Sequence, residues 1–108
     1  MRVNEIVLLN QAVEDLKDGE IFYNNTELGI GTYFWDSLIS DIESLIIFAG
    51  IHPKKYGLFQ MLSKRFPYSI YYEIVDSVAY VIAILPMRRN PSWISEELKN
   101  RSHLSLNF

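Results

Sequence analysis

The chain has 108 residues, of which 49% are apolar, and carries a formal net charge of −3. This length predicts a single domain spanning residues 1–108, with enough apolar side chains for one core. The absence of cysteine excludes disulfides and thiolate metal sites. The sequence has no signal-peptide pattern and no apolar stretch near 20 residues. We therefore expect a cytoplasmic protein without a membrane span.

The charged residues are unevenly divided between the two halves of the sequence. Residues 1–50 hold two basic and nine acidic side chains, whereas residues 51–108 hold eight basic and four acidic ones. Such asymmetry is typical of proteins that bind an acidic partner or nucleic acid, but it also arises when acidic residues only solvate helices. Two histidines and no glycine-rich phosphate motif lead us to expect neither a metal site nor a cofactor.

The first half of the sequence predicts one strand and two helices. A strand is expected from Val3 to Leu9, followed by a helix that Asn10 caps and that runs to about Tyr23. A second helix is expected from about Leu28 to Phe48. Gly29 and Gly31 would either let this helix approach the first one closely or delay its start. Residue spacing predicts an apolar stripe that faces the core, formed by Trp35, Leu38, Ile42, Leu45 and Ala49. This apolar face is widened by Ile39, Ile46 and Ile47. The polar residues off the stripe are expected to face solvent: Asp36, Asp41, Glu43 and Ser44.

The second half predicts a three-stranded meander and a final helix. After a loop at residues 52–57 that includes a solvated His52, strands are expected at residues 58–63, 66–75 and 78–85, with Asp76-Ser77 as a two-residue turn. Pro86 ends the last strand, and Asn90-Pro91 starts a helix over about residues 92–100, followed by a fraying tail from Arg101. The order β-α-α-β-β-β-α predicts an α+β fold, in which a helical hairpin and the last helix pack on one face of an antiparallel sheet.

Arg88 and Arg89 directly follow the last predicted strand, where a rigid sheet would hold them open to solvent. Paired guanidinium groups bind carboxylates and phosphates in a bidentate manner, so this position suits an anionic partner. The alternative is a structural ion-pair cluster with Glu73, Glu96 or Glu97, which would contribute about 0–1 kcal/mol for each exposed pair. The tyrosines at positions 68, 71, 72 and 80 similarly suit either the core or an exposed aromatic platform.

The segment FPYSIYYEIVDSVAYVIAILPMRRNPSW resembles the late hairpin of the RelE/ParE superfamily of small toxins from type II toxin–antitoxin modules. The matching positions are Phe66, Pro67, Tyr68, Ile70, Tyr72, Arg88, Arg89 and Pro91, with Trp93 one place early. The general layout of the family matches this chain from Val3 to about Leu98. The resemblance therefore implies a RelE/ParE-like fold and a toxin of a plasmid stabilisation module.

The two branches of the superfamily imply different activities. RelE-like toxins are ribosome-dependent mRNA endonucleases, and their basic residues would correspond here to Arg65, Arg88, Lys54 and Lys55. The tyrosine of that set falls near Ile94, which cannot accept a proton. ParE-like toxins act by binding DNA gyrase without this catalytic set, so the resemblance favours the ParE branch and a protein that is not an enzyme.

The resemblance also implies a partner, a cognate antitoxin that lays a partly disordered acidic segment across the toxin. The residues expected to bind the antitoxin or the target are Arg65, Arg88, Arg89, Trp93 and Tyr72, and oligomers are expected only through the toxin–antitoxin complex. A degenerate interaction module without toxicity remains the third alternative.

Overall fold

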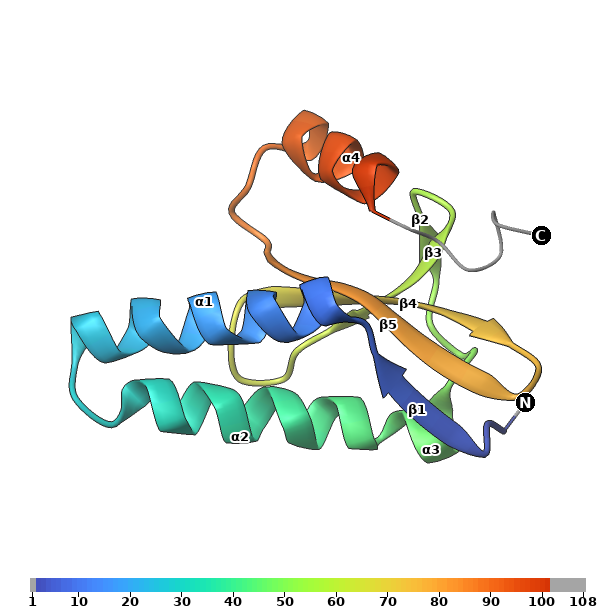
Figure 1. Cartoon of the computed structure of the whole chain (residues 1–108), viewed down its shortest axis with the longest axis horizontal. Helices are drawn as coiled ribbons and strands as arrows, with labels where there is room; N and C mark the ends of the chain where they lie inside the picture. Colours follow the sequence, from blue (N-terminus) through green and yellow to red (C-terminus); the bar gives the residue numbers. More distant parts are fainter. Residues whose placement is uncertain (1, 102–108) are drawn as a thin grey trace.

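The computed structural model describes residues 2–101, and these form a five-stranded sheet with helices on both sides (Figure 1). The sheet order is β1-β5-β4-β3-β2. None of the helices described is long and apolar enough to cross a membrane. The elements are β1 (Glu5–Leu8), α1 (Asn10–Thr26), α2 (Ile30–Glu43), α3 (Leu45–Phe48), β2 (Lys54–Lys55), β3 (Leu58–Leu62), β4 (Tyr68–Val75), β5 (Val78–Pro86) and α4 (Pro91–Asn100).

The predicted meander is confirmed as β3, β4 and β5, which pair in antiparallel fashion. Asp76 and Ser77 join β4 to β5 with φ angles of 50° and 65°. Positive φ at both central residues is the mark of the tight turn whose twist matches a hairpin. The sheet is mixed rather than antiparallel, because β1 lies parallel to β5, with Glu5 opposite Val78 and Leu8 opposite Val81.

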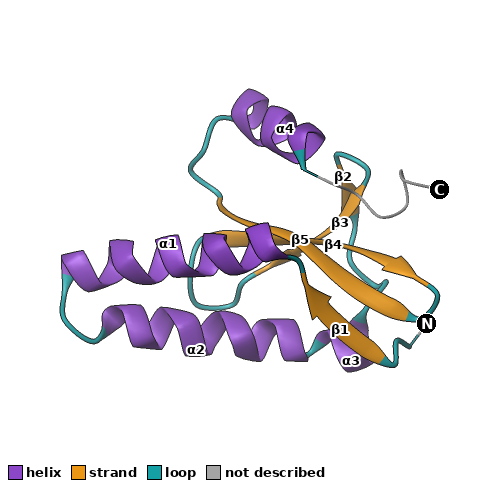
Figure 2. Ribbon diagram, in the orientation of Figure 1, coloured by secondary structure: helices purple, strands orange, loops and turns teal. Residues whose placement is uncertain are grey.

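The predicted helical hairpin is also confirmed, and it covers one face of the sheet (Figure 2). Gly31 brings the two helices together: its amide N–H donates to Asn24 Oδ1 at 2.9 Å, and a Cβ at this position would lie 2.4 Å from the Glu20 carbonyl oxygen. The core between the hairpin and the sheet includes the buried Leu16, Phe34, Leu38, Ile42, Ile70, Tyr72 and Val81.

The last helix lies on the opposite face of the sheet, which differs from the expectation that all helices share one face (Figure 1). Alternate residues of β4 point to opposite faces, so Ile70 packs under the hairpin whereas Tyr71 packs with Ile94 and Leu98 of α4. Asn90 caps α4 by accepting a hydrogen bond from the Ser92 amide at 2.7 Å, as the Asn-Pro start predicts. The core is therefore divided into two layers by the sheet.

Several local expectations for the helical half were wrong. The helix predicted from Leu28 to Phe48 is two helices broken at Ser44, and Asn10 is the first helical residue without a capping side-chain bond. Asp41 is only 4% exposed, because its Oδ2 accepts hydrogen bonds from Ser63 Oγ and the Lys64 amide. Ile46 and Ile47, which were expected to widen the apolar face, are exposed.

His52 is half-buried rather than solvated, and it is hydrogen-bonded to the core tyrosine Tyr72. The Tyr72 hydroxyl accepts from the Gly50 amide at 2.9 Å, so its own proton is free to be donated to His52 Nδ1. Burial lowers the pKa of His52 below its usual 6.5. The folded state therefore favours the neutral imidazole, which alone can accept this hydrogen bond.

This contact predicts a loss of stability in mild acid. A depressed folded-state pKa means that the contribution of His52 is complete above pH 6.5 and is lost as the pH falls through the lower pKa of the folded protein. Urea unfolding at pH 7.5 and 5.5 should show this decrease, and His52→Gln should make it smaller. An equal decrease in the variant would show that other groups cause the effect.

Candidate binding surface at the end of the sheet

Arg88 and Arg89 follow the end of β5, and both side chains are exposed. The guanidinium carbon of Arg88 lies 4.8 Å from the centre of the Phe22 ring of α1, and that of Arg89 lies 4.2 Å from the Trp93 ring of α4. Stacking on an aromatic face holds a guanidinium in place and leaves its N–H groups at the rim open to hydrogen bonding. The two arginines are therefore positioned by the helices on either side of them.

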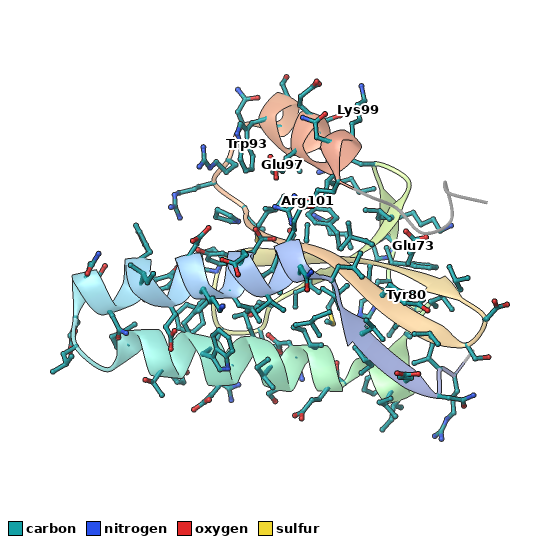
Figure 3. The ribbon with its side chains drawn as sticks, in the orientation of Figure 1. Glu73, Tyr80, Trp93, Glu97, Lys99 and Arg101 are labelled. Atoms are coloured by element: carbon teal, nitrogen blue, oxygen red, sulfur yellow. The ribbon has the colours of Figure 1, made fainter. Side chains whose placement is uncertain are left out.

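Neither arginine forms an ion pair within residues 2–101, so the predicted cluster with Glu73, Glu96 or Glu97 is not observed there. The structural arginine is instead Arg101, which was expected to begin a fraying tail. It donates to both carboxylate oxygens of Asp15, at 2.6 and 2.9 Å, and to Glu97 Oε2, at 3.0 Å from its Nε. Figure 3 shows Glu97 and Arg101 between α4 and the sheet.

The Asp15–Arg101 pair completes the hydrogen bonding of β5 beyond the point where β1 ends. Asp15 Oδ2 accepts from the Ile84 amide at 2.8 Å, and Arg101 Nη1 donates to the Ile82 carbonyl at 3.1 Å. Burial raises the pKa of the Asp15 carboxyl, and the Arg101 and Ile84 hydrogen bonds oppose this rise. Burial would lower the pKa of Arg101, but Asp15 and Glu97 raise it above its ordinary value.

A cleft of about 320 Å³ lies between α1, the end of β5 and α4. Both arginines, their two stacking rings and Tyr68 line it, together with the Asp15–Arg101 pair. Burial raises the pKa of the Tyr68 phenol, and the nearby Arg88 opposes this rise, so the phenol remains neutral and polar at physiological pH. Because Arg101 is already paired with carboxylates, the cations open to an incoming anion in this cleft are Arg88 and Arg89.

Of the other predicted site residues, Arg65 lies at the same end of the sheet and the two lysines do not. Arg65 is exposed in the loop between β3 and β4, which is tied to the Arg88 segment by a hydrogen bond from the Met87 amide to the Pro67 carbonyl at 2.8 Å. Lys54 and Lys55 pair with Phe59 and Leu58 at the far end of β3. The structure therefore does not bring the lysines to the arginines.

Tyr72 and the other tyrosines belong mainly to the core. Tyr72 is fully buried against the hairpin and stacks on Phe59 with ring centres 5.1 Å apart, so it offers no surface to a partner. Tyr68 and Tyr71 are also buried, and Tyr80 is half-buried. The core interpretation of these residues is confirmed, and Tyr72 does not belong to the binding surface.

Two residues of this surface were missed by sequence reasoning, Phe22 and Arg101. The sequence leaves open whether Phe22 or Tyr23 faces the core, and in the structure Phe22 is 46% exposed beside Arg88. Its neighbour Tyr23 takes the inward position and stacks on Phe34. Two adjacent aromatic residues on one helix are a signal that one of them lies outside the core.

Among the described residues, no group of three metal-ligating side chains is placed to hold an ion.

Comparisons with known proteins were made for both sequence and structure. No protein-family model and no curated protein sequence matches this chain. Among solved structures, it is similar to a chain described as "Chromosomal ParDE TA system from P. aeruginosa", with a TM-score of 0.71 over 78% of this chain and 96% of that chain. The sequence identity is 12%, so the likeness establishes the fold and not the activity. It supports the predicted resemblance, and the chain shares its fold with that chain of a ParDE system.

Proposed function

We propose that this protein is the toxin of a type II toxin–antitoxin module, acting in the cytoplasm and neutralised by a cognate antitoxin. The observation that carries the proposal is the pair of exposed, aromatic-stacked arginines at the sheet end of a ParE-like fold. Guanidinium groups held in this way suit the carboxylates of an acidic partner, since little side-chain entropy is lost on binding. Oligomers would form through the toxin–antitoxin complex.

DNA gyrase is the target that this arrangement supports best. A ribosome-dependent endonuclease needs a general base near its phosphate-binding arginines. The tyrosine position of the RelE-like set is occupied by Ile94 of α4, which is 7% exposed and packed between α4 and the sheet. Lys54 and Lys55, the substitutes for that base, lie at the other end of the sheet from Arg88. Gyrase binding, by contrast, needs only a surface.

Replacing both arginines by alanine should remove toxicity without unfolding the protein. We expect induced expression of the unmodified chain to arrest bacterial growth and the purified protein to inhibit supercoiling by gyrase. Arg88→Ala with Arg89→Ala should raise the inhibitory concentration by about tenfold or more, since a hydrogen bond to a charged group contributes about 1.5–3 kcal/mol. Lys17→Ala, which removes a cation from the exposed Lys17–Glu14 pair on α1, is the matched control and should change little.

Other outcomes of the same experiment identify the alternatives. Growth arrest with unaffected supercoiling and with mRNA cleaved in a translating extract would replace gyrase by the ribosome as the target. Unimpaired growth together with tight binding of an antitoxin would identify a non-toxic interaction module. Unimpaired growth without such binding would contradict the proposal as a whole.

A further inference from the structure

The short helix α3 presents apolar side chains to solvent. Leu45 and Ala49 face the core and are fully buried, so the residues between them point away from it. Five large apolar side chains on and beside α3 are between 40% and 68% exposed: Ile46, Ile47, Phe48, Ile51 and Leu62. These five residues are called the α3 patch below.

A hollow of about 260 Å³ lies within the α3 patch, on the hairpin side of the sheet. It is lined by three residues of the patch, Phe48, Ile51 and Leu62. It also runs along His52, whose ring is hydrogen-bonded to Tyr72, and the Tyr72 hydroxyl accepts from the Gly50 amide at 2.9 Å. These two bonds fix the segment that follows α3, and a surface fixed in this way loses little conformational entropy when a partner binds it.

The size of the α3 patch suits the centre of a protein interface. Its side chains expose on the order of 400 Å² of apolar surface, which is comparable to the largest patch of a typical monomer. A stable interface buries about 800 Å² on each partner, and somewhat more than half of that area is apolar. The patch would therefore supply the apolar centre of such an interface, and the polar residues around it would supply the rim.

The two sides of the α3 patch carry opposite charges. Lys64 lines the hollow together with Asp41, whose buried carboxylate already accepts two hydrogen bonds. Glu43 stands two residues after Asp41 on α2, about 200° around the helix axis, so it lies on the opposite side of this helix from Lys64. Glu43 also precedes Ile47 by four residues and therefore flanks the patch. Both charged side chains are exposed, and neither forms an ion pair within residues 2–101.

We propose that a second copy of the chain covers the α3 patch in a dimer with two-fold symmetry. Both copies of such a dimer use the same patch, and residues on opposite sides of the symmetry axis meet. Ile47 of each copy would enter the hollow of the other, and Glu43 of each copy would pair with Lys64 of the other.

The charges of the rim select a second copy over other occupants. An acidic peptide or an anionic membrane would match Lys64, but Glu43 would repel it, whereas a second copy brings one charge of each sign. The inference goes beyond the proposed function and does not depend on the arginine cleft. It differs from the expectation that oligomers form only through the antitoxin, because it adds a direct contact between two copies of the chain.

Sedimentation equilibrium of the full chain measures the dimer. We expect the unmodified chain to be mostly dimeric at about 100 µM, because interfaces of standard size dissociate at micromolar concentrations or below. Ile47→Asp would place a charge in the apolar centre and should raise the dissociation constant by about tenfold or more. Leu28→Asp is the matched control and should change it by less than about twofold, because Leu28 is 93% exposed at the opposite end of the hairpin from α3 (Figure 1).

Reversal of the two rim charges tests the two-fold arrangement. Glu43→Lys places like charges opposite one another at both symmetry-related positions, so it should weaken the dimer by about tenfold, and Lys64→Glu should do the same. The double variant, Glu43→Lys with Lys64→Glu, forms both pairs again with their signs exchanged. Its dissociation constant should return to within about threefold of that of the unmodified chain.

The negative outcomes are separate from those of the proposed function. An unmodified chain that remains monomeric at about 1 mM would overturn the inference, since a specific interface is tighter than that. An Ile47→Asp variant that dimerises as well as the unmodified chain would overturn it too, as would a double charge variant as weak as the single ones. A monomeric chain that binds phosphatidylglycerol vesicles and loses this binding in Ile47→Asp would assign the patch to a membrane surface instead. None of these results changes the toxin proposal, which growth, supercoiling and antitoxin binding test.

Discussion

Replacing Asp15 by alanine is expected to lower the free energy of unfolding by about 3–5 kcal/mol, the usual cost of removing one partner of a buried ion pair. The side chain of Arg101 is 6% exposed and that of Asp15 is 11% exposed, so the remaining guanidinium would be held away from water with Glu97 as the one carboxylate left beside it among the described residues. The Ile84 amide would lose its acceptor as well. Urea unfolding followed by circular dichroism measures the change.

The same helix offers a matched control for this prediction. Glu14 forms an ion pair with Lys17 at 3.4 Å, but these side chains are 65% and 55% exposed. Glu14→Ala should therefore cost less than about 1 kcal/mol. If Asp15→Ala were no more destabilising than Glu14→Ala, the Asp15–Arg101 pair would not hold α4 and the edge of β5 as inferred.

Local patterns were sufficient to predict most of the fold. The alternation from Tyr68 to Val75, the apolar run from Val78 and the Asn90-Pro91 start each express a constraint that acts within a few residues. All three produced elements at the expected places. The break at Ser44 was missed because the apolar stripe continues across it, so the spacing of Ile42 and Leu45 still reads as one helix.

The side of the sheet on which a helix packs is not a local property. α4 presents Ile94 and Leu98 to the sheet, and this pattern is the same whichever face the helix covers. The face is decided by which residues of β4 and β5 remain uncovered once the hairpin occupies the other side. Asp41 was misplaced for a related reason, since its partners Ser63 and Lys64 come from a loop more than 20 residues away.

The parts of the candidate binding surface that depend on local sequence could be predicted, and the parts that depend on distant residues could not. Arg88 and Arg89 were predicted because the end of a strand can be read from Pro86. The Phe22 ring that holds Arg88 was not predicted, because it reaches Arg88 from α1, which is distant in the sequence. The role of Arg101 depends on Asp15, which is 86 residues away in the sequence, and no spacing rule connects the two. Arg88 and Arg89 form an exposed surface, whereas Arg101 forms a buried ion pair. Only the partners of these arginines, which are distant in the sequence, distinguish the two roles.

The close approach of α1 and α2 depends on Gly31, which leads to the second large expected effect. Alanine is a better helix former than glycine by about 1 kcal/mol, so propensity alone would make Gly31→Ala stabilising. A Cβ at this position, however, would lie 2.4 Å from the Glu20 carbonyl oxygen and 2.4 Å from Asn24 Cγ. The carbonyl belongs to the backbone of α1 and cannot turn aside, so the two helices would have to separate.

We therefore expect Gly31→Ala to lower the free energy of unfolding by about 3 kcal/mol, because the cost of overpacking exceeds the gain in helix propensity. Separation of the helices would also lengthen the 2.9 Å bond from the Gly31 amide to Asn24 and loosen the packing of Phe34 one turn later. Thermal and urea unfolding measure the effect. Thr32→Ala, at the next and exposed position of α2, should stay within about 0.5 kcal/mol of the unmodified chain. A Gly31→Ala protein as stable as Thr32→Ala would show that α1 and α2 are not held at this distance.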